Sequence, residues 1–292
     1  MGTKIDLKTK GKAFSSKKTL NFKGNLVDLH SPIVMGILNV TPDSFYDGGR
    51  YDRNESALLR QAEQILRQGA TIIDIGGYSS RPGATDISVD EEKKRAINCV
   101  ALVSKNFPEA YISIDTFRAD VAQEAVEAGA CMINDISGGT LDKKMFDTVA
   151  FLQVPYVLMH MKGSPQNMKE LCHYDDLCGE IVDFFHSRLM LLREKGVADV
   201  VIDPGFGFAK NIDQNYELLR KLVVFQMLDV PLMAGLSRKS MIYKRLEISP
   251  DEALNGTTVL NTLALLNGAS VLRVHDVKEA VQTIKLLKYT YS

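Results

Sequence analysis

Polar and charged side chains follow a series of short apolar runs along this chain, and their types suit recognition of a polar, anionic ligand. Carboxylates and amides offer hydrogen-bond acceptors in fixed planes, whereas lysine and arginine bind anions. In chain order the groups are Asn39, Asp74, Asp115, Asn134 with Asp135, His160, Asp203, Ser237 to Lys239, and Arg273 with His275. A chain that places such groups after successive strands builds one pocket from them.

Asp115, Asn134 and Asp203 form a candidate polar floor for this pocket. Carboxylates and amides can read a planar ring that carries an amino group and ring N–H donors. The competing interpretation is a metal site, since aspartate-rich barrel mouths bind divalent cations. The spread of these groups over alternate strands makes a site built from protein ligands alone the weaker interpretation. A Mg2+ held mainly by substrate phosphates, with help from Asn39, stays open.

Basic groups after the last two apolar runs form a candidate anion site. Residues 237–240 read SRKS, and Arg273 is followed two residues later by His275 on the same side of a strand. Barrels often bind phosphate at these two positions. The alternative, that Arg238 and Arg273 only form surface ion pairs, has less weight because two basic groups converge there. Arg81 adds a further positive charge at the same mouth.

Other reactive residues do not indicate nucleophilic or metal chemistry. His160 fits a wall residue as well as a functional one. Cys172, His173 and Cys178 lack a matching fourth metal ligand, and no C-x-x-C pair is present. No local signature of a Ser–His–Asp or Cys–His arrangement is evident.

The elements that must position these groups alternate between strands and helices. The apolar runs are short and β-branched, which is typical of parallel strands buried on both faces. Strands are expected at 33–39, 71–75, 111–115, 131–135, 156–160, 200–203, 231–236 and 270–274. Helices are expected near 54–67, 89–105, 119–128, 142–152, 174–195, 211–225, 251–267 and 277–288. This alternation predicts an α/β (β/α)8 TIM barrel, and residues 19–29 around Gly24-Asn25 predict a β-hairpin that closes its bottom.

Length and composition restrict the function further. We expect residues 1–18 to be a flexible basic N-terminus and residues 19–292 a single barrel domain, since the chain has 292 residues and such barrels need about 250. The net charge of −1 argues against a nucleic-acid partner. Without a signal segment or a spanning apolar stretch, we expect no membrane partner and a cytoplasmic location. The long glycine-rich loops at 40–53 and 76–88 are expected to act as lids.

Motifs in the predicted loops carry a resemblance to a known family. The segments are MGILNVTPDSF at 35–45, GGYSSRPGA at 76–84, DPGFGF at 203–208, SRKS at 237–240 and RVHDV at 273–277. Together they resemble dihydropteroate synthase, a family of pterin-binding enzymes, and the resemblance covers about residues 33–287. One such motif would be weak, but the set in this order is very specific.

The resemblance implies condensation of 6-hydroxymethyl-7,8-dihydropterin diphosphate with 4-aminobenzoate to give 7,8-dihydropteroate and diphosphate. It also implies Mg2+ as cofactor, a homodimer and a target of sulfonamides. The implied catalytic residues are Asp115, Lys239, Arg273 and His275. Pterin would be read by Asp115, Asn134, Asp203 and Lys239, and diphosphate by Arg273 and His275 with Asn39 as metal ligand. The 4-aminobenzoate pocket would use Ser80, Arg81, Phe208 and Ser240, under a lid loop with Asp43, Ser44 and Phe45.

Departures from the family pattern are small. The family commonly has Glu and Thr where this chain has Tyr78 and Ser80. Ser80 keeps the hydroxyl, whereas Tyr78 has no assigned role, and neither do Asp74, Asp135 and His160. The rival functions are a methyltetrahydrofolate methyltransferase, which needs no diphosphate site, and a non-catalytic pterin-binding paralogue.

Overall fold

The computed structural model describes residues 19–40, 51–79 and 86–291, with the backbone alone at 51–54. Its strands are β1 Thr19–Phe22, β2 Asn25–Asp28, β3 Ile33–Asn39, β4 Ile72–Gly76, β5 Tyr111–Asp115, β6 Met132–Asp135, β7 Tyr156–Met159, β8 Val200–Asp203, β9 Met233–Ala234 and β10 Val271–Val274. Its α-helices are α2 Tyr51–Arg67, α3 Val89–Asn106, α4 Ala119–Glu127, α5 Met145–Leu152, α6 Leu177–Glu194, α7 Ile212–Arg220, α8 Ser240–Leu246, α9 Leu254–Leu266 and α10 Val277–Tyr291. Short 3-10 helices are η1 Met168–Leu171, η2 Leu222–Leu228 and η3 Pro250–Glu252.

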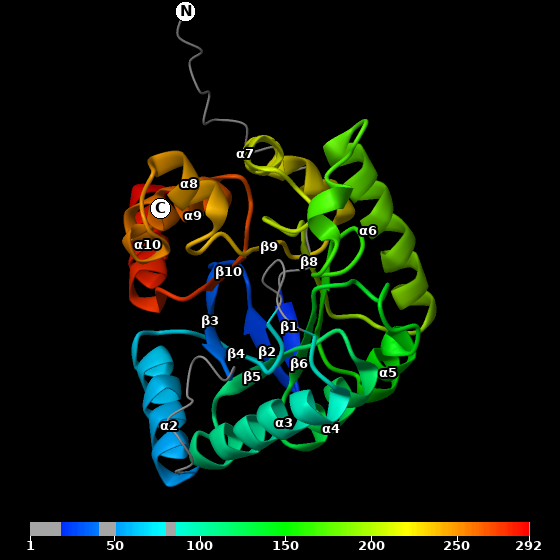
Figure 1. The fold of residues 1–292 in the computed structure, drawn as a ribbon, viewed down its shortest axis with the longest axis vertical. Helices are drawn as coiled ribbons and strands as arrows, with labels where there is room; N and C mark the ends of the chain where they lie inside the picture. The colour runs from blue at the N-terminus through cyan, green and yellow to red at the C-terminus, as the bar shows by residue number, and fades with distance from the viewer. Residues whose placement is uncertain (1–18, 41–50, 80–85, 292) are drawn as a thin grey trace, which may run out of the picture.

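Eight parallel strands form the centre of the molecule, in the order β8-β7-β6-β5-β4-β3-β10-β9. A parallel bridge between Ile202 and Leu232 joins the two ends of this sheet, so the strands enclose a barrel. Figure 1 shows the helices arranged around the central strands. The predicted (β/α)8 barrel is therefore confirmed.

The hairpin β1–β2 closes one end of the barrel, as expected. Leu20 and Phe22 are almost fully buried in one apolar cluster with residues from the first half of the barrel strands: Met35, Ile72, Met132, Val157, Val201, Met233 and Val271. Lys23 and Gly24 form the turn, with φ of 51° and 94°, because Phe22 pairs with Asn25. The hairpin thus covers the amino end of the strands and leaves the carboxyl end for a pocket. The boundary predicted at residue 18 stays a prediction, since residues 1–18 lie outside the described part.

The second apolar layer lies between the barrel and its helices. Strands β4, β6, β7 and β8 are buried along their whole length, as expected for parallel strands covered on both faces. Their outward side chains pack against helical residues such as Ala62, Val100 and Phe185. This layer fixes the strands, and so the polar groups at their ends.

Two helical regions differ from the sequence-based expectation. The helix predicted at 211–225 ends at Arg220, and η2 follows it. The buried residues of η2, Leu222, Phe225 and Leu228, recur every third position, which is the period of a 3-10 helix. Helix α8 was not predicted, since its seven residues are too few to show a periodic pattern. Among the described residues, no helix is long and apolar enough to cross a membrane.

Candidate active site

A row of side chains crosses adjacent strands at the carboxyl end of the barrel. Asn39 pairs with Gly76, Gly76 with Asp115, and Asp115 with Asn134 in the strand register. Side chains in register lie on the same face, as do residues two positions apart, so Asp74 belongs to this group. The Asn134 amide donates to Asp74 Oδ2 at 3.0 Å. The predicted contiguity of Asp115 and Asn134 is therefore present, and Asp74 joins them.

Arg273 crosses the mouth of the barrel to two of these carboxylates. Its Nε donates to Asp74 Oδ2 and its terminal nitrogen to Asp115 Oδ2, both at 2.6 Å. Burial raises the pKa of Asp115 to about 7, although the Arg273 charge opposes the shift. Burial also acts to lower the pKa of Arg273, but Asp74 and Asp115 outweigh it and raise that pKa. In this arrangement the group expected at the diphosphate lies on the polar floor.

Asp203 and Lys239 form the other side of the pocket. Asp203 is buried at the end of β8, and its Oδ1 accepts from the Gly205 N–H at 2.8 Å. Burial raises the pKa of Asp203, and it lowers the pKa of Lys239 to about 8, each opposed by the charge of the other. A methyl group built on Gly235 would lie 3.7 Å from Asp203 Oδ2 and 3.8 Å from Lys239 Nζ. The absence of a side chain at Gly235 therefore leaves the space between an acceptor and a cation free for a ligand.

An apolar wall lies beside Lys239. The Phe208 ring is half-buried, and its centroid is 4.9 Å from Lys239 Nζ. Phe208 packs against a cluster of Ile136, Met159, Met161, Met168 and Ala209. Ser240, the first residue of α8, follows Lys239 directly. An aromatic face, a cation and a hydroxyl thus lie next to the polar floor.

The remaining basic residues after β9 and β10 have different roles. His275 is exposed, and its backbone N–H donates to the Ser237 hydroxyl at 3.1 Å. Arg238 forms two hydrogen bonds to Asp276, at 3.0 and 2.8 Å. The ion-pair interpretation therefore applies to Arg238, while Arg273 faces the floor.

Tyr78, which had no assigned role, lies in a buried cluster. Its hydroxyl accepts from the Gln166 amide at 2.7 Å, and its ring meets Phe117 edge-on at 5.1 Å. The Arg118 guanidinium lies 5.4 Å from the same ring. Tyr78 therefore connects the segment after β4 to those after β5 and β7.

Asp135 points away from the pocket, since it alternates with Asn134 along β6. It accepts from the backbone N–H groups of Ser137 and Gly139 at 2.7 and 2.8 Å, and from the Tyr156 hydroxyl at 2.7 Å. It therefore holds the turn after β6.

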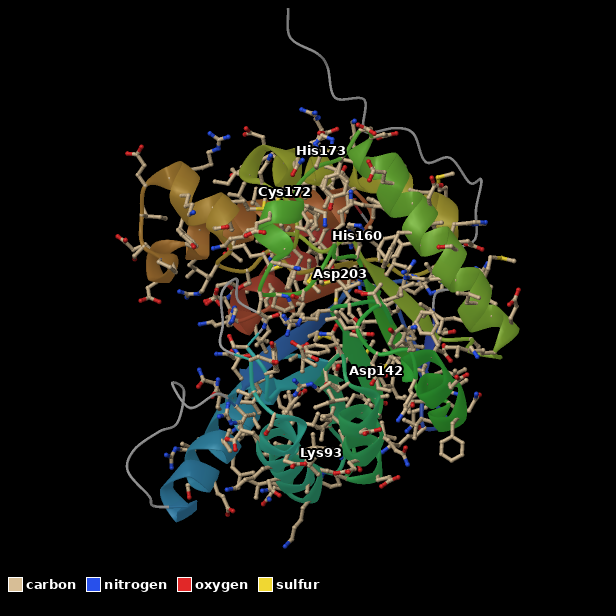
Figure 2. The ribbon with its side chains drawn as sticks, turned by 45° about the vertical axis from the view of Figure 1, so that its right-hand side comes forward. Lys93, Asp142, His160, Cys172, His173 and Asp203 are labelled. Carbon is tan, nitrogen blue, oxygen red and sulfur yellow. The ribbon has the colours of Figure 1, made fainter. Side chains whose placement is uncertain are left out.

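His160 lies next to the end of β8, where its backbone N–H donates to Asp203 at 3.0 Å. Figure 2 shows His160 and Asp203 side by side. The His160 ring meets the ammonium of Lys210, a residue that our sequence analysis missed. The only available signal was a lysine within the glycine-rich segment that follows β8.

Asn39 is the remaining candidate ligand for a cation. It is half-buried, and its side-chain oxygen would lie 3.8 Å from a methyl group built on Gly76. Among the described residues, no group of three or more histidine, cysteine, aspartate or glutamate side chains is placed to hold a metal. Asp43, Ser44, Phe45, Ser80 and Arg81 lie outside the described residues, so their roles stay predictions.

Comparison with known proteins gives a consistent result. Residues 35–275 match the family model described as pterin binding enzyme. The chain is 42% identical to the dihydropteroate synthase of Escherichia coli over 272 residues, which covers 92% of this chain and 95% of the relative.

Two solved structures are similar along nearly their whole length. The dihydropteroate synthase of Yersinia pestis with a sulfonamide drug complex has a TM-score of 0.85 at 40% identity, with 93% of this chain and 98% of the other covered. That of Xanthomonas albilineans with 4-aminobenzoic acid has a TM-score of 0.87 at 38% identity, with 95% and 99% covered.

Proposed function

The chain belongs to the pterin binding enzyme family as a dihydropteroate synthase of folate biosynthesis, and we propose how its pocket carries out that reaction. The substrates are 6-hydroxymethyl-7,8-dihydropterin diphosphate and 4-aminobenzoate, and the products are 7,8-dihydropteroate and diphosphate. The observation that supports this best is the convergence of Asp74, Asp115, Asn134 and Asp203 on two cations, Lys239 and Arg273, at one end of the barrel.

The polar floor suits the pterin ring. Asp203 keeps Oδ2 available beside the space at Gly235, while its Oδ1 is used by the Gly205 N–H. That free oxygen can accept from the amino group and ring N–H of a pterin. Asn134 and Asp115 offer further polar atoms on the neighbouring strands, and Lys239 can donate to a ring acceptor. Buried groups of this kind select ligands strongly, because a poor match leaves them unpaired.

The bond to the leaving group breaks first in the proposed mechanism. Diphosphate departs from the pterin methylene with the bonding electron pair, and the resulting cation is delocalised into the electron-rich ring. The carboxylates of Asp115 and Asp203 stabilise that positive charge in a water-poor site. The neutral amine of 4-aminobenzoate then attacks the methylene and loses a proton, so no strong protein base is required. The displacement is therefore SN1-like.

Arg273 and His275 are proposed to bind the diphosphate. Arg273 is already charged in the pocket, and its contacts to Asp74 and Asp115 hold its guanidinium at the mouth. His275, which is exposed at the rim beside Ser237, can meet the outer phosphate. Mg2+ is the proposed cofactor, and it would offset the charge on the departing diphosphate. The single amide oxygen of Asn39 fits a cation that takes its other ligands from substrate and water.

The second substrate is proposed to bind against Phe208. Its ring would pack on the Phe208 face, and its carboxylate would meet Ser240 and, in the loops outside the described part, Ser80 and Arg81. Sulfonamides are proposed as inhibitors of the same pocket, since the similar Yersinia pestis enzyme has a solved complex with such a drug. The loop with Asp43, Ser44 and Phe45 is proposed to cover the site.

A homodimer is the proposed assembly. Helix α9 exposes Val259, Leu263 and Leu266, at 51%, 43% and 44% of their surface, on one helical stripe. Leu286 of the adjoining α10 is 68% exposed. Such apolar surface commonly marks a protein interface. We propose a cytoplasmic location as well, supported by the free thiols of Cys99, Cys131, Cys172 and Cys178, which are typical of a reducing compartment.

Diphosphate release in the presence of Mg2+ tests the proposed reaction. Release is expected only when both the pterin diphosphate and 4-aminobenzoate are present, with 7,8-dihydropteroate formed in equal amount. A methyltransferase would instead consume methyltetrahydrofolate, and a non-catalytic paralogue would bind pterin without turnover. Either result would replace the proposed function.

A further inference from the structure

Lys210 is a buried cation that the proposed mechanism does not use. It lies between the segment that follows β8 and the start of α7, and only 6% of its surface is exposed. Its ammonium donates to the backbone oxygens of Gly205 and Phe208, each at 3.0 Å. Nδ1 of His160 lies 3.1 Å away. The three donors of the ammonium therefore have three acceptors.

The contact to His160 defines the state of both groups. An ammonium has no acceptor, so Nδ1 of His160 must accept and the ring proton must be on Nε2. Burial lowers the pKa of His160 well below its usual range, and the Lys210 charge acts in the same direction. Phe184 meets the His160 ring edge-on at 4.8 Å. The imidazole is thus a fixed, neutral acceptor at the end of β7.

The turn spanned by Lys210 has an unusual backbone. Gly205 and Gly207 have φ of 73° and 81°, and Ala209, which is not glycine, has φ of 47°. Left-handed conformations at alanine are unfavourable and need support from surrounding contacts. The Lys210 ammonium bonds both ends of this turn, and the Asn215 side chain accepts from the Gly207 N–H at 2.6 Å.

The same turn carries two features of the pocket. The backbone oxygen of Phe206 accepts from the Lys239 ammonium. The Phe208 ring, from the residue whose backbone oxygen is bonded to Lys210, faces the same ammonium. A change in the turn would therefore move the aromatic wall, whereas Asp115 and Asn134 are fixed on strands elsewhere.

We propose that Lys210, held by His160, is a positioning residue that sets the Phe208 ring against which 4-aminobenzoate binds. This inference rests on the proposed function of the pocket. It differs from a merely structural role in one respect: loss of Lys210 should affect one substrate much more than the other.

Steady-state kinetics of Lys210→Met test this difference. The KM for 4-aminobenzoate is expected to rise about tenfold, which corresponds to the loss of one charged hydrogen-bond set. The KM for the pterin diphosphate should change by less than about threefold by the same reasoning. Lys221→Met is the matched control, since Lys221 pairs with Glu217 at the surface, and both KM values should stay at the wild-type level. Equal changes in the two KM values, or none in a folded protein, would overturn the proposal.

A second measurement does not depend on catalysis. The chain has no tryptophan, so Phe208→Trp introduces a single fluorescent reporter at the wall. Adding Lys210→Gln, which keeps two N–H donors and suits a case where Lys210→Met does not fold, should increase quenching by acrylamide. Unchanged quenching would overturn the positioning role. If wild-type protein releases no diphosphate but quenching still increases, the proposed function fails and the control of Phe208 by Lys210 stands.

Discussion

Arg273 and Asp74 form an ion pair across a strand that lies between them. They are 199 positions apart, and Nε of Arg273 on β10 meets Oδ2 of Asp74 on β4 at 2.6 Å over the intervening β3. Asp74 has no exposed surface, and its other oxygen has no hydrogen-bond partner among the described residues. The pair therefore connects the anion end of the pocket to its floor.

Asp74→Ala should destabilise the fold by about 3–5 kcal/mol, because it leaves the charge of Arg273 with one carboxylate fewer in a buried site. Chemical denaturation gives this value. Asp74→Asn, which keeps an acceptor for Arg273, should lose less. Wild-type stability of Asp74→Ala would show that the pair makes no net contribution.

Asp203→Asn should weaken pterin binding while preserving the fold. The amide oxygen can still accept from the Gly205 N–H, but the NH2 group then faces the pterin donors in place of Oδ2. Unpaired donors cost about 1–3 kcal/mol, so the dissociation constant should rise about tenfold or more. Calorimetry with a pterin ligand measures it, and an unchanged constant would remove Asp203 from the site.

Arg273→Ala separates the two possible roles of this arginine. If it binds diphosphate, affinity for the diphosphate-bearing pterin should fall far more than affinity for the hydroxymethyl pterin, which lacks the anion. Titration of both ligands measures the ratio. Equal losses would indicate that Arg273 acts only by ordering Asp74 and Asp115.

Gly235→Ala should block the pocket without harming the fold. The added methyl would make ordinary contacts, 3.7 Å to Asp203 Oδ2, 3.8 Å to Lys239 Nζ and 4.0 Å to Arg273 Cβ. Thermal unfolding should therefore match the wild type within a few degrees, as a shift below about 1 kcal/mol implies. Pterin binding should be lost, because the methyl occupies the space between acceptor and cation. Normal pterin affinity would place the ring elsewhere.

The pH profile should have an alkaline limb from Lys239. Burial lowers its pKa to about 8, so kcat/KM for the pterin substrate should fall as pH rises through that value and the donor loses its charge. Lys239→Arg should move the limb out of the measurable range, since arginine stays protonated. A wild-type limb that Lys239→Arg does not move would assign it to another group.

Unfolding would not explain this limb through Lys239. Because the folded pKa is about 8 and the ordinary value is 10.5, the folded chain binds fewer protons than the unfolded chain in between. The contribution of Lys239 to stability therefore increases with pH in that window. Circular dichroism over the same range is the control.

The sequence by itself determined the barrel and much of its polar floor. Short β-branched runs specify strands through local sterics and burial, and a residue at a strand end has its position fixed by that strand. Asn39, Asp115, Asn134 and Asp203 were found in this way. The hairpin at the closed end followed from its alternation of apolar and polar residues, although its turn is formed by Lys23 and Gly24.

Only the tertiary structure decided which of these groups meet. The contact of Arg273 with Asp74 depends on closure of the barrel and on strand register, neither of which leaves a local pattern. The environment of Lys210 depends likewise on a turn after β8 packing against His160 of β7, 50 positions earlier. Periodicity is a property of neighbours along the chain, whereas desolvation and charge pairing arise from neighbours in space. Sequence could therefore predict the residues of the pocket, but not their partners or protonation states.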